Sequence, residues 1–300
     1  MLHTQKLFTN ERLCKAMTGM SVQEFHALVP AFSQALVAYR YQLNPDRKRK
    51  IGGGQKGKLP TVEDKLACIL MYLKIYPTYD VMSFLTDRDR SKCCRSVQFL
   101  LPVLEMALGR TLVLPERKTR TVAEVFERFP EIKDVFVDGT ERRVQKPKNL
   151  KKRNKLYSGK KKATTRKTII VSNEKKRILY MSKTKSGRRH DKRIADKEHL
   201  FTGIPPDVAV WTDTGFQGAQ KLRQNIVMPA KASKNKPLTE AEKAENRVVS
   251  SFRVVSEHAI GGFKRFRAAA DVYRNKLPNL DDLMTEVACG LWNFHLAQTA

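Results

Sequence analysis

The sequence predicts an α/β protein, with an all-α N-terminal region followed by a mixed sheet flanked by helices. Two patterns of apolar residues support this prediction. Up to about residue 129, apolar residues recur every three or four positions, as they do in amphipathic helices. From Val135 onward, short apolar runs of strand length alternate with helical patterns. Because 41% of the 300 residues are hydrophobic, the chain can bury the core of one large or two modest domains.

The N-terminal region is expected to contain a helical segment, a linker and a three-helix module. Residues 1–46 form the helical segment, in which apolar residues from Phe25 to Val37 follow helical spacing. The linker at 47–58 is basic and glycine-rich, a composition that stays flexible. Residues 59–110 follow, where Thr61 is the expected N-cap of the first helix and Pro77 ends it.

The third helix of this module is expected to begin near Asp89 and to carry a basic face. Arg88, Lys92 and Arg95 lie on that face. Three short helices with a basic outer face resemble a helix-turn-helix module, which binds DNA. The alternative is an ordinary three-helix bundle with a solvated basic face. The charge of the whole chain favours DNA binding over this alternative.

Residues 131–300 are expected to form one α/β domain. Strands are predicted at 135–137, 166–172, 177–183, 208–211 and 225–228, and the second and third of them form a hairpin. A helix is expected to begin near Asp191, a long helix to cover 239–267 and a last helix to cover 281–298.

The charge of the chain indicates a polyanionic partner. Fifty-eight Lys and Arg against thirty Asp and Glu leave a net charge of +28. Nucleic acid is the first partner to consider, although a basic membrane-surface protein or a ribosomal protein would carry a similar charge. The five cysteines form no C-x-x-C pair and are expected to be reduced, and no signal peptide or membrane-spanning run is recognised. We therefore expect a cytoplasmic, nucleoid-associated protein.

Three acids are candidates for a metal site. Asp138 and Asp213 each follow a short apolar run and precede a glycine, and carboxylates at strand ends can hold Mg²⁺. Taken singly, each is more often a turn former or a helix cap. Glu257 shares a helix face with Arg253 and Lys264, which would place cations beside a carboxylate. The alternative for this helix is a surface ion pair between Arg253 and Glu257.

The three motifs resemble those of bacterial DDE-type insertion-sequence transposases, close to the insertion sequence 5 group. The resemblance rests on Val137–Glu141, on Thr212–Gly218 and on Glu257 within Arg253-x3-Glu257-x6-Lys264. It extends upstream to the glycines 52–54 and to Leu59–Asp64, and so covers about residues 50–295. Ser250 stands where the family often has a tyrosine.

The resemblance implies a fold, a reaction and a set of partners. The fold is a helix-turn-helix domain followed by a ribonuclease-H-like catalytic domain. Asp138, Asp213 and Glu257 would be the catalytic acids and would hold two Mg²⁺ or Mn²⁺ ions, which promote in-line displacement at phosphorus. The partner would be double-stranded DNA, as transposon terminal repeats and as target. The reaction would be strand cleavage followed by strand transfer, with a homo-oligomer pairing two transposon ends.

A basic stretch at 142–167 separates the first two acids. It holds thirteen cations and no acid, among them Lys160, Lys161 and Lys162, and we expect it to contact DNA phosphates. Tyr157 within it either stacks on a base or packs internally. Asp191 is expected to be a helix N-cap rather than a ligand, and Glu141 is a weaker candidate ligand.

Two further functions remain open from the sequence. One is an endonuclease that cuts DNA without integrating it. The other is a DNA-binding protein without catalysis, such as a decayed transposase or a regulator. The acids at all three motif positions favour an active enzyme.

Overall fold

The computed structural model describes residues 4–48, 51, 57–117, 122–232 and 237–299, and divides the chain into two compact units. The first unit comprises residues 1–114, 263–271 and 277–300, and the second comprises residues 115–262 and 272–276. The glycines 52–54 of the expected linker lie outside the described residues. Among the described residues, no helix is both long and apolar enough to cross a bilayer.

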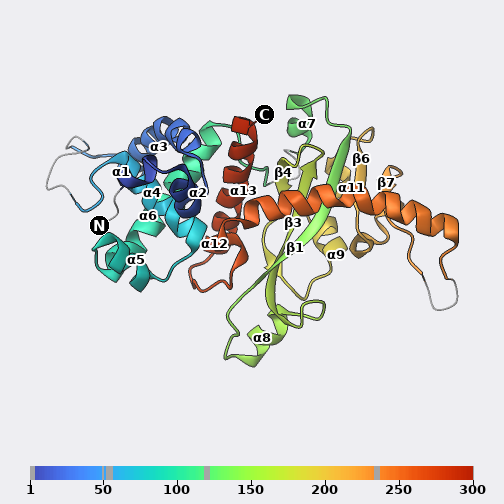
Figure 1. Cartoon of the computed structure of the whole chain (residues 1–300). Coiled ribbons are helices and arrows are strands. Elements are labelled where there is room, and N and C mark those ends of the chain that lie inside the picture. Colours follow the sequence, from blue (N-terminus) through green and yellow to red (C-terminus); the bar gives the residue numbers. More distant parts are fainter. Residues whose placement is uncertain (1–3, 49–50, 52–56, 118–121, 233–236, 300) are drawn as a thin grey trace. The chain divides into compact units, whose positions relative to one another are not determined.

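The first unit is all-α, as the sequence predicts (Figure 1). The expected three-helix module is present, and Thr61 caps its first helix in a reciprocal capping box with Asp64. Asp89 is the N-cap residue of the third helix. The helices are α1 (Thr4–Phe8), α2 (Glu11–Thr18), α3 (Val22–Leu43), α4 (Val62–Ile75), α5 (Tyr79–Thr86), α6 (Arg90–Arg110), α12 (Arg267–Ala270) and α13 (Leu280–Thr299).

The C-terminal helix completes the core of this unit. α13 packs against α6, and α12 packs against α4. Gly290 lets α13 lie close to Leu108 of α6 and to Leu114, because a Cβ at this position would lie 3.1 Å and 2.8 Å from their methyl carbons. Asn293 donates a hydrogen bond to the backbone oxygen of Val113 at 2.8 Å. The end of the chain therefore belongs to the helical unit, far in sequence from the helices that it contacts.

A buried carboxylate links the two ends of this unit. Glu24 is 4% exposed, contacts Nδ1 of His295 and accepts the backbone N–H of Ser21 at 2.6 Å. Burial alone would raise the pKa of Glu24. The hydrogen bonds from Ser21 and His295 outweigh burial and hold the pKa of Glu24 below its ordinary value of 4.5.

We expect acid to destabilise the first unit through Glu24. A carboxylate with a lowered pKa contributes stability that is complete above its unfolded pKa and is lost as the pH falls through its folded pKa. The loss should begin below pH 4.5. It should amount to about 1.5–3 kcal/mol, the range for hydrogen bonds to charged groups. Thermal unfolding followed by Trp292 fluorescence, in a Trp211→Phe background, measures it.

The Glu24→Gln variant isolates this effect. It should be less stable at neutral pH, and its stability should change less between neutral and acid pH than that of the parent. Asp46→Asn removes an exposed carboxylate of the same unit and should keep the parent's pH dependence. A pH dependence as steep in Glu24→Gln as in the parent would contradict the assignment.

The second unit is built on a mixed sheet. Its strands are β1 (Asp134–Arg143), β2 (Tyr157–Ser158), β3 (Ala163–Asn173), β4 (Ile178–Met181), β5 (Lys185–Ser186), β6 (Ala209–Thr212) and β7 (Ile226–Val227). Its helices are α7 (Val122–Arg128), α8 (Leu150–Leu156), α9 (Asp191–Lys197), α10 (Leu200–Gly203) and α11 (Glu240–Lys264), whose last two residues fall in the first unit. Short 3₁₀ turns cover Thr214–Phe216 and Ala219–Lys221.

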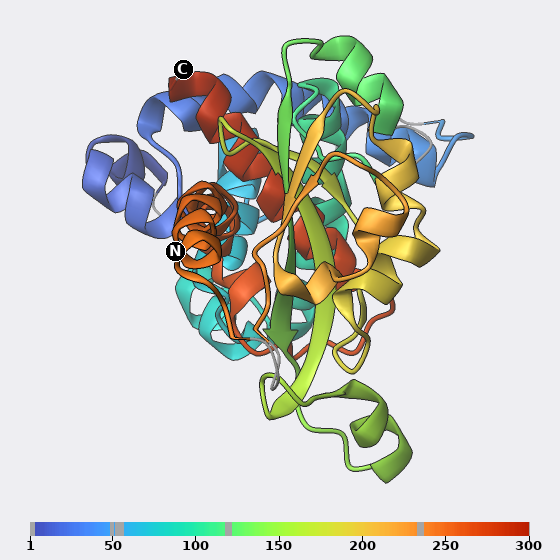
Figure 2. The ribbon, with the colours of Figure 1, turned by 90° about the vertical axis from the view of Figure 1, so that its right-hand side faces the viewer.

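The strand order is consistent with a ribonuclease-H-like fold, as expected. β3 pairs antiparallel with both β1 and β4, whereas β6 pairs parallel with β1 and with β7. Helices flank the sheet, with α9 and α10 on one side and α11 on the other (Figure 2). The predicted hairpin corresponds to β3 and β4, and the long helix predicted at 239–267 corresponds to α11.

Alternation along the strands separates two faces of the sheet. Val135 and Val137 of β1 belong to a buried cluster that includes Ile194 of α9 and Phe216. The residues between and after them, Phe136 and Asp138, point to the opposite face because side chains alternate along a strand. There, Phe136 stacks on Trp211 with ring centroids 6.2 Å apart. Asp138 therefore shares a sheet face with an aromatic pair rather than with the main core.

Two local expectations differ from the structure. β1 does not end at Asp138 but continues to Arg143, because β3 supplies a partner for each residue as far as the pair Arg143 and Thr165. The N-cap of α9 is His190, so Asp191 is the first helical residue rather than the cap. Its carboxylate contacts Lys167 instead of a backbone N–H of the helix.

Candidate active site

The strand register brings Asp138 and Asp213 together. β1 and β6 run parallel, and their last paired residues are Val137 and Thr212. The next residue along each strand is an aspartate, so the two carboxylates leave the sheet side by side. The backbone N–H of Gly139 donates to Asp138 Oδ1 at 2.7 Å, and that of Gly215 donates to Asp213 Oδ1 at 2.9 Å. Both acids are only partly exposed.

The charge around Asp138 is unbalanced. Burial, and then the nearby charge of Asp213, raise the pKa of Asp138 to about 6, and Asp191 adds to this effect. The N–H of Gly139 and the charge of Arg253 act in the opposite direction without cancelling it. The pair therefore concentrates negative charge, which protonation or a bound cation would relieve.

The third predicted acid lies on α11. Arg253 is partly buried there and is close enough to Asp138 to affect its pKa. Glu257 is exposed one turn farther along the same helix face. Lys264 is half-buried in the last turn of α11, within the first unit. Among the described residues, no three His, Cys, Asp or Glu side chains are grouped so that they could hold a metal ion.

A buried ion network lies beside the acid pair. Lys167 is 6% exposed, and its ammonium lies 2.8 Å from Asp191 Oδ1 and 3.3 Å from Glu141 Oε1. Thr165 donates to the other carboxylate oxygen of Glu141 at 2.6 Å. A Cβ at Gly139 would lie 2.8 Å from the Asp191 carboxyl carbon. Asp191 thus lies close to β1 at Gly139, the residue that follows Asp138.

Alternation along β3 could have revealed the position of Lys167. Lys167, Ile169 and Val171 are spaced by two, so they share one face of the strand, and the last two are buried. A lysine on the same strand face as buried apolar residues is itself buried, and a buried charge requires a counter-ion. The sequence interpretation instead counted Lys167 among the cations of the stretch 142–167 that were expected to contact DNA phosphates.

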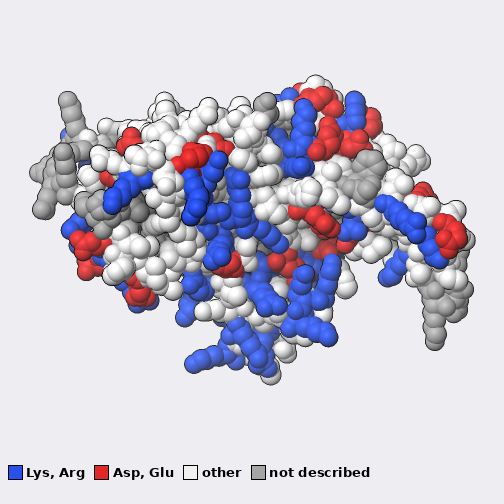
Figure 3. Space-filling view, viewed as in Figure 1, with Lys and Arg blue, Asp and Glu red and all other residues white. Residues whose placement is uncertain are grey.

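The basic stretch is divided between the interior and the surface. Arg142 is 8% exposed, and its guanidinium lies 4.9 Å from the ring centroid of Tyr273. Arg142 and Lys167 are therefore structural, contrary to the expectation of phosphate contacts along the whole stretch. Lys160, Lys161 and Lys162 are exposed. Figure 3 shows Lys and Arg gathered over α8 and the adjoining ends of β1 and β3.

The predicted DNA-contacting residues of the expected helix-turn-helix module lie around the start of α6. Arg88 donates to Ser96 at 2.7 Å and is partly buried. Lys92 pairs with Asp89 at 3.1 Å, and both side chains are largely exposed. Arg95 is exposed and donates to the backbone oxygen of Ser91 at 3.4 Å. Lys92 and Arg95 thus lie on an open surface, while Arg88 stabilises the start of α6.

A cavity of about 480 Å³ opens onto the acid site. Asp213 and Gly215 line it on one side, together with Asp191 and Lys167. Tyr157, which is 46% exposed, and Lys160 line it as well. The cavity combines acids that can attract metal ions, cations that can bind phosphate and an aromatic ring, which together suit a nucleic-acid substrate.

Comparison with known proteins identifies the family. A model of the DDE superfamily endonucleases matches residues 137–293, which begin one residue before Asp138 and include Asp213 and Glu257. The chain belongs to this family, as the resemblance predicted. The family is one of endonucleases, and its transposases act on DNA.

A relative extends the similarity to nearly the whole chain. It is a probable transposase for the insertion sequence element IS702 from Microchaete diplosiphon, 28% identical over 290 residues, which are 96% of each chain. The similarity thus includes the helical first unit. No solved structure matches the chain significantly.

Proposed function

We propose that this protein is a DNA transposase that binds transposon ends and catalyses metal-dependent strand cleavage and strand transfer. The observation that carries the proposal is the parallel register of β1 and β6, which sets Asp138 beside Asp213. Asp213 in turn lines an open cavity. Membership of the DDE superfamily endonucleases and similarity to a probable transposase support it. Asp138, Asp213 and Glu257 are its proposed catalytic acids.

The donor set fits a hard divalent cation. Asp138 and Asp213 offer only oxygen atoms, which Mg²⁺ and Mn²⁺ prefer. Burial, and then the charge of Asp213, raise the pKa of Asp138, and a bound cation would offset the effect of that neighbouring charge. Asp138, Asp213 and Glu257 would hold two such ions, whose chemistry is to activate the attacking oxygen and to neutralise the leaving one.

The chain's own residues would bind and orient the DNA. Because Arg253 is close enough to Asp138 to affect its pKa, its guanidinium would contact a phosphate near that acid. Lys264 and the exposed cations Lys160, Lys161 and Lys162 would also bind the DNA backbone. Lys92 and Arg95 of α6, with Arg88 supporting them, would contact DNA through the helical unit.

A cleavage assay on wild-type protein tests the proposal. The substrate is an end-labelled duplex that carries the ends of the protein's own element, incubated with Mg²⁺, with Mn²⁺ or with a chelator. We expect cleavage with either metal and none with the chelator, and the cut strand should end in a 3′-hydroxyl. Joining of that strand to a target plasmid would demonstrate strand transfer.

The other functions left open by the sequence predict different results in the same assay. Cleavage without joining to the plasmid would indicate an endonuclease that does not integrate. Binding to the ends without cleavage under either metal would overturn the enzymatic proposal and leave a DNA-binding protein. Sedimentation with paired-end DNA tests the expected oligomer, and a monomer on that DNA would contradict it.

A further inference from the structure

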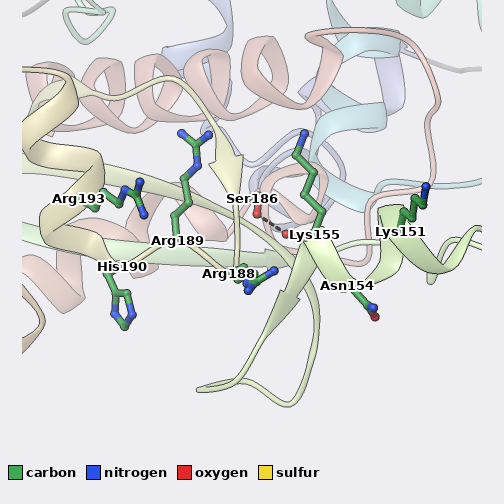
Figure 4. A pocket seen from close by; sticks show the side chains of 8 residues that line it. All are labelled: Lys151, Asn154, Lys155, Ser186, Arg188, Arg189, His190 and Arg193. Atoms are coloured by element: carbon green, nitrogen blue, oxygen red, sulfur yellow. Dashed lines mark hydrogen bonds between the residues drawn. The ribbon is translucent and has the colours of Figure 1, made fainter.

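A basic cavity of about 640 Å³ lies in the second unit, between α8 and the segment that leads from β5 into α9. Figure 4 shows the side chains that line it, which come from α8 on one side and from β5, that segment and α9 on the other. Five cations line it and no acid does: Lys151, Lys155, Arg188, Arg189 and Arg193. Within the described residues, no carboxylate forms an ion pair with any of these five.

The two walls of this basic cavity are held in place by backbone contacts. Ser186 donates its hydroxyl to the backbone oxygen of Lys155, which joins β5 to α8. The backbone N–H of Gly187 donates to the oxygen of Thr165 at 2.9 Å. A Cβ at Gly187 would lie 1.8 Å from the Thr165 hydroxyl, so the segment is packed directly on β3. The cations therefore project from a fixed frame.

The basic cavity adjoins the cavity at the acid site. Arg188, Arg189 and His190 line both. The two cavities therefore share part of their walls, and Asp213 lines the one at the acid site. If one phosphate of a nucleic-acid backbone lay near Asp213, the next few phosphates would thus lie near these cations. Lone cations without carboxylate partners favour such a polyanion, because its charge compensates theirs.

We propose that the basic cavity binds a single DNA strand that continues from the reacting phosphate. The inference rests on the proposed function, since it takes the acid site as the place of reaction. A volume of about 640 Å³ lies in the range of sites that take a small ligand, which suits a short length of one strand. Tyr157 in the acid-site cavity offers a ring on which an unpaired base stacks.

The test measures DNA binding without divalent metal. The probes are a fluorescein-labelled oligothymidine and a duplex of the same length, followed by anisotropy over a range of salt concentrations. The variant Lys151→Gln/Lys155→Gln/Arg193→Gln removes three exposed cations that line the basic cavity alone. The control Lys175→Gln/Lys183→Gln/Lys197→Gln removes three exposed cations of the same unit that line neither cavity.

We expect the cavity variant to bind the single strand more weakly and with a shallower salt dependence. A single strand contributes about 0.7 to the log–log salt slope for each phosphate contact, so three lost contacts reduce the slope by about 2. The duplex slope should change no more than it does in the control variant. Equal loss for duplex and single strand would overturn the inference in favour of a general duplex surface, and a single-strand slope equal to that of the control would overturn it outright.

Failure of this inference can be told apart from failure of the proposed function. If wild type cuts its element's ends but the cavity variant keeps the wild-type slope, the strand site is wrong and the transposase proposal stands. If wild type cuts nothing under either metal but the cavity variant loses slope, the strand site stands as a nucleic-acid site without the proposed catalysis.

Discussion

Asp213→Asn is expected to reduce metal-dependent DNA cleavage by about 10³-fold or more, the range for loss of an essential catalytic group. The substitution removes the negative charge of Asp213, which directly follows β6 and lies beside Asp138. It keeps the oxygen that accepts the Gly215 N–H at 2.9 Å, so the turn after β6 should persist. The expected loss is therefore one of catalysis and not of folding. Initial cleavage rates on end-labelled duplex, with Mg²⁺ and with Mn²⁺, measure it.

A second aspartate provides the control. Asp207 lies just before β6 on an exposed surface, 3.8 Å from Lys133. Asp207→Asn makes the same change of charge in the same unit and should retain wild-type cleavage. Thermal unfolding and affinity for DNA should match wild type in both variants. Cleavage by Asp213→Asn at a rate near that of Asp207→Asn would contradict the assignment of the acid pair.

The same assay examines the third acid. Glu257→Gln should lose cleavage to a similar degree if its carboxylate joins the pair in the complex with DNA and metal. In the structure Glu257 is exposed, one helical turn from Arg253, which is close enough to Asp138 to affect its pKa. Wild-type cleavage by Glu257→Gln would remove Glu257 from the proposed site and would leave the roles of Asp138 and Asp213 intact.

Local signals in the sequence were sufficient for most helices and for the first two acids. The Thr61 capping box, the break at Pro77 and the apolar spacing in α11 are each encoded within a few residues. Asp138 and Asp213 were recognisable because each follows a buried apolar run. The pairing of Val137 with Thr212 brings the two acids together. These paired residues are 75 positions apart in the sequence, and nothing in the residues around either of them indicates the pairing.

The polar half of β1 could not be predicted in the same way. Thr140 to Arg143 lack apolar residues, so they read as a loop, yet β3 pairs with each of them. Charged residues there are buried by partners distant in sequence: Arg142 by Tyr273 and Glu141 by Lys167. Where burial depends on a partner of opposite charge or on an aromatic ring, hydrophobic periodicity carries no information about it.

Lys167→Met is expected to destabilise the second unit by about 3–5 kcal/mol, the cost of breaking a buried ion pair by removing one partner. The ammonium compensates two carboxylates, Glu141 and Asp191, and also donates to the backbone oxygen of Arg189 at 3.1 Å. Burial alone would lower the pKa of Lys167, but its bonds to Asp191 and Glu141 outweigh burial and raise the pKa. Methionine keeps the apolar stem and removes the charge.

Urea unfolding followed by Trp211 fluorescence, in a Trp292→Phe background, measures this loss in the second unit. The loss should shrink as the pH is lowered, because protonation of Glu141, left without Lys167, removes the cost of burying its charge. Adding Glu141→Gln and Asp191→Asn should restore part of the stability at neutral pH, which a packing defect alone would not explain.

Lys133→Met is the control, since Lys133 and Asp207 are each 67% exposed and such pairs contribute at most about 1 kcal/mol. A loss in Lys167→Met no larger than in this control, or one independent of pH, would show that the three groups do not form a coupled network.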